Sequence, residues 1–336
     1  MKRTLRIVLA LVLTLGLMGG ALAGEVDLAQ IEQLQKKLNY PTRTIEFVIP
    51  FGAAGSADIC FRSVADVMSK LLKTNISIAN KPGAGGVTGL SYAFDHDADG
   101  YTLCAVTPSM AIAEAKGAFP FTEEFVPVAL MEMDLFVVST LTSNPYFTDF
   151  EGFVEYAKAN PGAVTIGGTS SGGLDEYQAR QFGDACGVEL TFVPYDSGGE
   201  HKAAVLGGEI VLYMDKLSSF TSMLQYEQIK PIIVIYHERL NVEELKDVPC
   251  TVEKGIDFTT GSWRGLVVRK GTPSEIVDFL TQVCEAVYWS EAFQQTLKND
   301  NADIIYGFKN AEDFAKLITE EVEAYTAVVA KYSTVK

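Results

Sequence analysis

The chain has 336 residues, 48% of them hydrophobic, and a formal net charge of −16 at pH 7. This length and apolar content suffice for a sizeable buried core and favour two lobes over one. A protein this acidic repels nucleic acid and anionic membrane surfaces, since both are bound through basic patches. We therefore expect no nucleic-acid partner, and an anionic ligand must be held by local backbone dipoles or by a buried arginine.

Residues 1–23 have the pattern of a secretory signal peptide. Three basic residues precede an apolar run from Ile7 to Leu17, and Ala21-Leu22-Ala23 offers a small-residue cleavage site. The apolar run is too short to span a membrane. Cleavage after Ala23 removes three positive charges and leaves a net charge of −19. The pattern predicts a mature protein in the periplasm or another extracytoplasmic space.

The stretch from Thr44 to Arg62 combines a strand, a loop with almost no side chains, and the start of a helix. Apolar and β-branched residues from Thr44 to Pro50 predict a short buried strand. Residues 52–57, GAAGSA, form the loop, and apolar residues at helical spacing begin near Asp58. Bare backbone N–H groups and the helix dipole make such a loop an anion site. The alternative is an ordinary turn of small residues between a strand and a helix.

A second copy of this arrangement runs from Ala163 to Gly173, AVTIGGTSSGG, and opens a helix from Leu174 to Cys186. Again a strand enters a loop of glycine, serine and threonine. Because the two copies lie in different halves of the chain, their loops can face each other across a cleft. We therefore expect each loop to hold one end of a small anion.

The rest of the chain alternates strand and helix patterns, which indicates an α/β fold with mostly parallel sheets covered on both faces. Residues 24–40 predict an amphipathic helix lying on one lobe, with a partner-binding arm as the alternative. Residues 126–140 and 262–268 are interpreted as two strands that cross between the lobes. An amphipathic C-terminal helix is expected to complete the first lobe. Further strands are expected at 76–80, 102–106, 163–167, 189–193, 210–214 and 232–236.

The cysteines and histidines indicate neither a metal site nor a cofactor. The five cysteines are widely spaced and include no C-x-x-C motif, and none of the three histidines pairs at metal-ligand spacing. We interpret the cysteines as small buried hydrophobic residues, with one bridge between Cys186 and Cys250 as the alternative.

Eight short motifs run in order through residues 40–336: YPTRTIEFVIPF with GSAD-x-x-x-R, NKPGAGGVTG, DGYTL, NPGAVTIGGTSSGG, VPY, LGGEIVLYMD, DVP and GSWRGLVVRKGTP. Together they resemble the periplasmic solute-binding proteins of tripartite tricarboxylate transporters, the Bug family. The resemblance implies a two-lobed "Venus flytrap", with two mostly parallel sheets flanked by helices and joined by two crossing strands. One lobe would comprise residues 41–134 and 262–336, and the other residues 135–261. It further implies a monomeric receptor, not an enzyme, that binds a small carboxylate and docks on large and small membrane subunits.

The resemblance also implies a set of ligand-binding positions, which agree with the two loops found from the residue pattern. They comprise the first loop, the second loop and further cleft positions: Gly55, Ser56, Ala57 and Asp58; Thr169, Ser170 and Ser171; and Thr107, Ser109, Tyr195 and Asp215.

Two charged residues beside these positions bear on the ligand. Asp196 follows Tyr195 where the family commonly has lysine, which favours a ligand that carries an amino or hydroxyl donor. Arg264 lies on the expected return strand, where it would either grip a carboxylate through two parallel hydrogen bonds or form an ion pair between the lobes. Asp58 is expected mainly to cap its helix, and Arg62 to pair with an acid.

Two other functions fit parts of the sequence. Residues 168–172 match the G-x-S-x-G nucleophile elbow with Ser170, and Asp196 or Asp215 followed by His237 completes the order of a serine hydrolase. His237 lies in a charged stretch that reads as an exposed loop or helix start, where it would not activate a buried nucleophile. We therefore do not expect an enzyme. A ligand-binding receptor of a signalling system would have the same two lobes.

Overall fold

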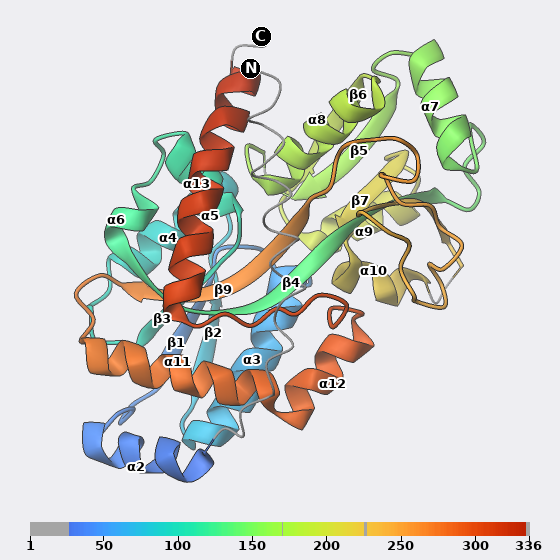
Figure 1. The fold of residues 1–336 in the computed structure, drawn as a ribbon. Coiled ribbons are helices and arrows are strands. Elements are labelled where there is room, and N and C mark those ends of the chain that lie inside the picture. The colour runs from blue at the N-terminus through green and yellow to red at the C-terminus, as the bar shows by residue number, and fades with distance from the viewer. Residues whose placement is uncertain (1–26, 170, 225–226, 334–336) are drawn as a thin grey trace.

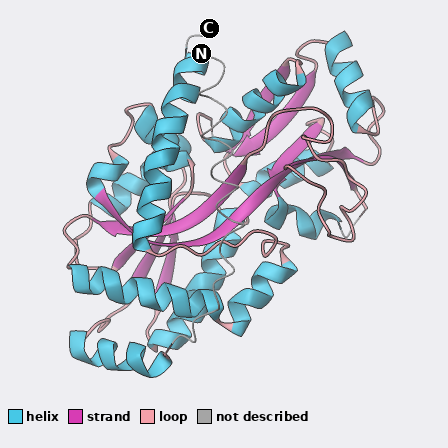
Figure 2. Cartoon of the chain, viewed as in Figure 1, coloured by secondary structure: helices cyan, strands magenta, loops and turns pink. Residues whose placement is uncertain are grey.

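The computed structural model describes residues 27–169, 171–224 and 227–333, which form a twisted sheet covered by helices (Figures 1 and 2). Residues 1–23, the expected signal peptide, lie outside the described ranges. The sheet has nine strands in the order β2-β1-β3-β9-β4-β7-β5-β6, and β8 also pairs with β4. The strands are β1 (Ile45–Ile49), β2 (Ile76–Asn80), β3 (Thr102–Val106), β4 (Phe125–Leu141), β5 (Val164–Thr169), β6 (Leu190–Tyr195), β7 (Leu212–Lys216), β8 (Ile229–Ile235) and β9 (Gly261–Arg269).

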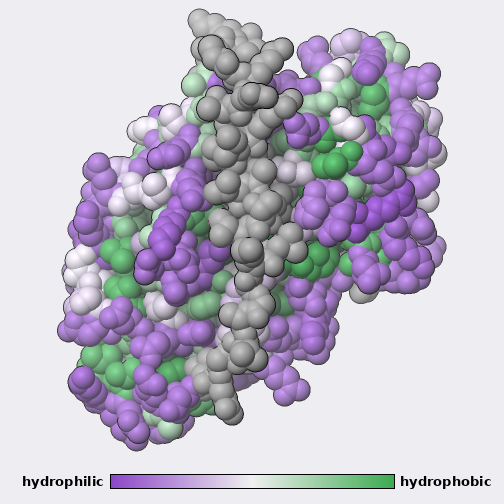
Figure 3. Space-filling view, in the orientation of Figure 1, coloured by the Kyte–Doolittle hydropathy of each residue, from purple (hydrophilic) through white to green (hydrophobic). Residues whose placement is uncertain are grey.

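Helices follow most strands and cover the sheet. In the described ranges, no helix combines the length and the apolar character needed to cross a membrane. The face of the molecule in Figure 3 is mostly hydrophilic, with apolar residues in small patches. The helices are α2 (Leu28–Leu38), α3 (Ser56–Leu72), the 3-10 turn η2 (Ala84–Gly86), α4 (Val87–Phe94), α5 (Ser109–Ala115), α6 (Phe121–Glu124), α7 (Phe150–Ala159), α8 (Leu174–Cys186), α9 (Gly198–Leu206), α10 (Leu217–Leu224), α11 (Ser274–Trp289), α12 (Glu291–Asn299) and α13 (Ala311–Ser333).

Each lobe is built around a parallel part of the sheet. In the first lobe β1 pairs in parallel with β2 and β3, and in the second β5 pairs in parallel with β6 and β7. Nearly every residue of β1 is buried, because helices cover both faces of the sheet there. This double burial explains why the strand is a continuous apolar run and not an alternating pattern.

Two antiparallel strands connect the lobes. β4 and β9 pair along Phe125–Leu135, and β4 then continues into the second lobe, where it pairs with β7 and β8. With 17 residues, β4 is about 56 Å long, far beyond an ordinary strand. The predicted α/β fold with two crossing strands is confirmed, and the crossing strands join the two parallel parts into one continuous sheet.

The C-terminal helix α13 packs on both lobes. Phe314, Leu317 and Ile318 near its start belong to an apolar cluster that includes Trp263 of β9. Farther along, its residues 325–329 contribute to the cluster that fills the second lobe. The sequence analysis expected this helix to complete the first lobe, and its apolar face also covers the crossing region and reaches the cluster of the second lobe. The residue boundaries of the lobes stay a prediction.

Helix α2 lies on the first lobe. Asp27 caps it by accepting a hydrogen bond from the N–H of Ala29 at 2.9 Å. Ile31 is buried in the apolar cluster of the first lobe. The side-chain amide of Gln35 donates to the carbonyl of Leu72 at 2.9 Å, which ties α2 to the end of α3.

All five cysteines are buried and unbridged. Burial raises the pKa of the thiols of Cys60, Cys186 and Cys284 to about 12, so these thiols stay protonated at neutral pH. The interpretation as buried hydrophobic residues is confirmed, and the alternative bridge between Cys186 and Cys250 is not formed.

Candidate functional site

A cavity lies between the two lobes, where their parallel strands end. It encloses about 600 Å³, including its mouth to solvent. Residues at or just after the carboxyl ends of β1, β3, β5, β6 and β7 line it, and this is where open α/β sheets bind their ligands. We call it the interlobe cavity; its lining comprises Phe51, Gly52, Gly55, Ser56, Ala57, Thr107, Ser109, Thr169, Leu174, Asp175, Asp196, Gly198, Asp215, Lys216, Ser262 and Arg264.

Three helices, α3, α8 and α9, begin at the interlobe cavity. The N-cap residues of α3 and α8 are Gly55 and Gly173, which have no side chain to accept the first N–H groups. Ser56 and Ala57 in the first turn of α3 line the cavity, as does Gly198 at the start of α9. Helix N-termini carry partial positive charge and free N–H donors. An anion in the cavity would therefore face the positive ends of helix dipoles from both lobes.

The two lobes touch at the mouth of this cavity. A methyl group added at Gly198 would lie 2.6 Å from the Cα of Gly55, and one added at Gly52 would lie 2.7 Å from the Cβ of Ser197. Such distances leave no room for a side chain, so the backbone of the first loop lies directly against the start of α9. The structure is therefore a closed arrangement of the lobes.

The carboxylate of Asp58 holds the first loop in shape. It accepts hydrogen bonds from the N–H of Ala54 at 3.0 Å, from Nε of Arg62 at 2.8 Å and from the amide of Asn80 at 2.9 Å. Burial raises the pKa of Asp58, but these hydrogen bonds outweigh it and hold the pKa below its usual range. Asp58 therefore acts on the loop backbone and does not line the cavity; its backbone partner, Ala54, precedes the helix, so the expected capping of the first helical N–H groups is not formed.

Asp175 holds the second loop in the same way. Its Oδ2 accepts hydrogen bonds from the N–H and the hydroxyl of Thr169, at 2.8 and 2.7 Å, while its Oδ1 pairs with the ammonium of Lys216. Lys216 also lies 3.5 Å from Oδ1 of Asp215. Burial lowers the pKa of Lys216, but the two carboxylates outweigh it and raise the pKa above its usual range. Lys216 therefore keeps its positive charge at neutral pH, beside the carboxylates of Asp175 and Asp215.

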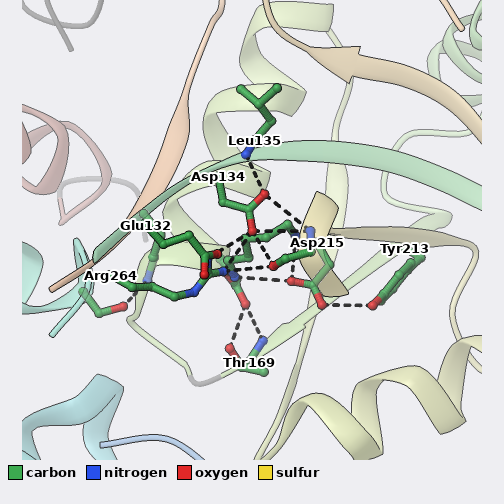
Figure 4. A network of polar contacts seen from close by, with 12 residues as sticks. Glu132, Asp134, Leu135, Thr169, Tyr213, Asp215 and Arg264 are labelled. Atoms are coloured by element: carbon green, nitrogen blue, oxygen red, sulfur yellow. Dashed lines mark hydrogen bonds and ion pairs between the residues drawn. The ribbon is translucent and has the colours of Figure 1, made fainter. Parts of the chain in front are cut away.

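Arg264 forms a second buried ion-pair cluster next to the cavity (Figure 4). Its guanidinium pairs with Glu132 and, at 3.1 Å, with Oδ2 of Asp134, which also accepts a hydrogen bond from the hydroxyl of Ser218. Burial lowers the pKa of Arg264 to about 10 and raises that of Asp134 to about 7. Arg264 keeps its charge at neutral pH. Its ion pairs join the two crossing strands and are not the expected pair between the lobes, and Arg264 also lines the cavity, so its contact with a carboxylate ligand stays a prediction.

Most of the expected site residues line the interlobe cavity. Ser171 does not, and its hydroxyl lies 3.3 Å from Oε2 of Glu176. Tyr195 does not line it either, because its ring stacks on the buried ring of His201 with the centroids 5.6 Å apart. Ser170 lies outside the described residues. Those that line the cavity are Gly55, Ser56, Ala57, Thr107, Ser109, Thr169, Asp196, Asp215 and Arg264.

Among the lining residues that the sequence analysis did not name as site residues, Asp175, Lys216 and Gly198 matter most for the geometry of the cavity. Asp175 stands in the first turn of α8 as Asp58 stands in the first turn of α3, and this repeat is visible in the sequence. Lys216 ends a strand that is buried throughout, where a charged residue is unusual and signals a specific partner. No signal in the sequence marks Gly198, because its role depends on the approach of the other lobe.

The aspartate and the histidine of the hydrolase hypothesis do not share the cavity, and Ser170 lies outside the described residues. Asp215 lines the interlobe cavity, whereas Nε2 of His237 lies 3.5 Å from Glu238 and His237 is not part of the lining. Within the described ranges, no group of three or more histidine, cysteine, aspartate or glutamate residues is arranged to hold a metal ion.

Comparison with known proteins places the chain in a family. The family model for tripartite tricarboxylate transporter receptors matches residues 60–333. A protein of Agrobacterium vitis, described as a UPF0065 protein in the TAR-I ttuE-ttuC' intergenic region, is 30% identical over 74% of this chain and 72% of its own length.

Two similar solved structures contain carboxylates. MatC from Rhodopseudomonas palustris with bound malate has a TM-score of 0.78 and 25% identity, over 86% of this chain and 100% of its own. The R. palustris protein Rpa4515 with adipate has a TM-score of 0.80 and 26% identity, over 87% of this chain and 97% of its own. The resemblance seen in the motifs is thereby confirmed: the chain belongs to the tripartite tricarboxylate transporter receptor family, a family of periplasmic solute-binding proteins.

Proposed function

We propose that this protein captures a small carboxylate outside the cytoplasm and delivers it to the large and small membrane subunits of a tripartite tricarboxylate transporter. The observation that carries the proposal is the convergence of three helix N-termini, from both lobes, on one cavity with the Lys216 ammonium in its wall. Such dipoles and free N–H groups favour an anion. The malate and adipate in the two similar structures support the same ligand class here.

We further propose a di- or tricarboxylate that carries an amino or hydroxyl group. Asp196 and Asp215 both line the interlobe cavity. Asp215 is 5% exposed and accepts hydrogen bonds from the hydroxyl of Tyr213 at 2.9 Å and from the N–H of Lys216 at 2.8 Å. A ligand carboxylate facing these groups with no donor between them is costly. An amino or hydroxyl group on the ligand supplies that donor.

Calorimetry with succinate, malate and aspartate tests the ligand. We expect the wild type to favour malate or aspartate over succinate, and Asp196→Lys to shift the preference toward succinate by on the order of 1–3 kcal/mol. Glu209→Lys, the same charge change at an exposed residue outside the cavity lining, is the control and should leave the ranking unchanged. Equal rankings in wild type and Asp196→Lys would contradict the role of Asp196.

The broader proposal of carboxylate capture is tested by thermal shift with mono-, di- and tricarboxylates. A ligand at a hundred times its dissociation constant should add about 2.7 kcal/mol to the free energy of unfolding. No stabilisation by any of them would contradict it. Delivery is tested in cells of the source organism, where deletion of this chain should abolish uptake of the radiolabelled ligand. Unchanged uptake would argue against a transport role.

A further inference from the structure

A second cavity is lined by residues of the crossing strands β4 and β9 and of the helices α8 and α13. We call it the hinge cavity. Ser262 of β9 lines both this cavity and the interlobe cavity. Asp134 of β4 lines the hinge cavity and pairs with Arg264, which lines the interlobe cavity. The two cavities are therefore neighbours on either side of the hinge strands.

Unpartnered polar atoms gather in the hinge cavity. Gln178 is 1% exposed, and its amide N–H donates to the hydroxyl of Tyr325 at 3.0 Å, which leaves its Oε1 with no donor. Oε2 of Glu321 has no hydrogen-bond partner at ordinary distance either, and the indole Nε1 of Trp263, which is 2% exposed, is the donor beside this carboxylate. Buried polar atoms are normally satisfied, so the two acceptors in this cavity, Oε1 of Gln178 and Oε2 of Glu321, point to an absent donor.

The charged groups of the hinge cavity are all acidic. Among the described residues that line it, Asp134, Glu320 and Glu321 carry charge, and no lysine, arginine or histidine is present. Asp134 is paired with Arg264, whereas no described basic side chain forms an ion pair with Glu320 or Glu321. Burial raises the pKa of Glu321 to about 7, and the neighbouring Trp263 side chain offsets part of that rise. The cavity therefore has buried acceptors and negative charge with no cation to match them.

We propose that the hinge cavity binds a small primary ammonium ion. Its N–H groups would donate to Oε2 of Glu321 and Oε1 of Gln178, and its charge would neutralise the Glu321 carboxylate. An anion is excluded by the three carboxyl groups, and the described residues offer no cluster suited to a metal ion. This site is separate from the proposed carboxylate site and stands without it.

Ammonium binding in the hinge cavity should strengthen as the pH rises. An ammonium ion pairs with ionised Glu321 and so competes with the proton. The titratable groups facing Glu321 are Asp134 from β4 and Glu320 and Tyr325 from α13, while the lining residues of β9 and α8 do not titrate. Because the pKa of Glu321 is about 7, ammonium affinity should rise on the order of tenfold between pH 6 and pH 8.

Methylammonium chloride is the probe, and tetramethylammonium chloride at equal concentration is the control for ionic strength, since it has no N–H donor. The melting temperature and tryptophan fluorescence of the mature protein are followed at pH 6 and pH 8. We expect a saturable rise in melting temperature with methylammonium at pH 8, a smaller rise at pH 6, and none with tetramethylammonium.

Variants locate the effect within the molecule. Glu321→Gln keeps the shape of the side chain and should abolish the methylammonium response, whereas Glu323→Gln, at an exposed position of the same helix, should keep it. Ala324→Leu fills the cavity without changing a charge and should also abolish the response, which keeps the test valid if Glu321→Gln folds poorly. An equal response to both salts, a wild-type response in folded Glu321→Gln or Ala324→Leu, or no response at pH 8 would each overturn the proposal.

Discussion

Replacing Gly198 with alanine should weaken ligand binding, because it adds a methyl group where the two lobes touch. The added Cβ would lie 2.6 Å from the Cα and 3.1 Å from the N of Gly55. Carbon atoms pack at about 3.5–4.0 Å, so the first loop must withdraw by about 1 Å. Overpacking of this kind costs about 1–3 kcal/mol. If the ligand binds to the closed arrangement, its affinity should fall by about 5- to 150-fold.

Gly199→Ala is the matched control for this prediction. Its Cβ would meet Oγ of Ser197 at 3.8 Å and the Cβ of Ala54 at 3.9 Å, which are ordinary contacts. Both variants are titrated with malate by calorimetry, and their thermal melts are compared with that of the wild type. Gly199→Ala should bind within about 0.5 kcal/mol of the wild type. Wild-type affinity in a folded Gly198→Ala protein would refute the reasoning, because the ligand-bound state would then lack the contact between Gly198 and Gly55.

Three further changes test the charges and the hinge. Lys216→Met should lower the free energy of unfolding by about 3–5 kcal/mol in urea melts, because it leaves Asp175 buried without its cation; a loss below 1 kcal/mol would contradict this. Burial lowers the pKa of His201, so the unfolded chain binds its proton first and stability should fall below about pH 6.5 by up to about 1.4 kcal/mol per pH unit. In His201→Leu this dependence of the free energy of unfolding on pH should disappear. An unchanged pH dependence would show that other groups cause it. In Trp289→Phe, the fluorescence of Trp263 should change when malate binds; a silent Trp263 with binding confirmed by calorimetry would argue against closure around β9.

The sequence by itself determined the local units of this protein. Both strand-loop-helix units, beginning near Thr44 and Ala163, were predicted to within a few residues, because apolar spacing and loops without side chains are encoded in short stretches. The crossing strands were found in the same way, since an apolar run of the length of β4 fits no ordinary strand. The meeting of both loops at one cavity was expected because two copies of the unit in different halves of the chain can face each other across a cleft, and residues of both loops line the interlobe cavity.

Only the tertiary structure decided which partners meet in the interior. Lys216 pairs with Asp175, 41 residues away in the chain, and Tyr195 turns from the cavity to stack on His201. Gly198 matters only because Gly55 of the other lobe approaches it, and α13 covers both lobes because its apolar face continues past the first. The energy of a buried charge or a close backbone contact depends on groups that are distant in sequence and adjacent in space. No periodicity within a short stretch encodes such a partner.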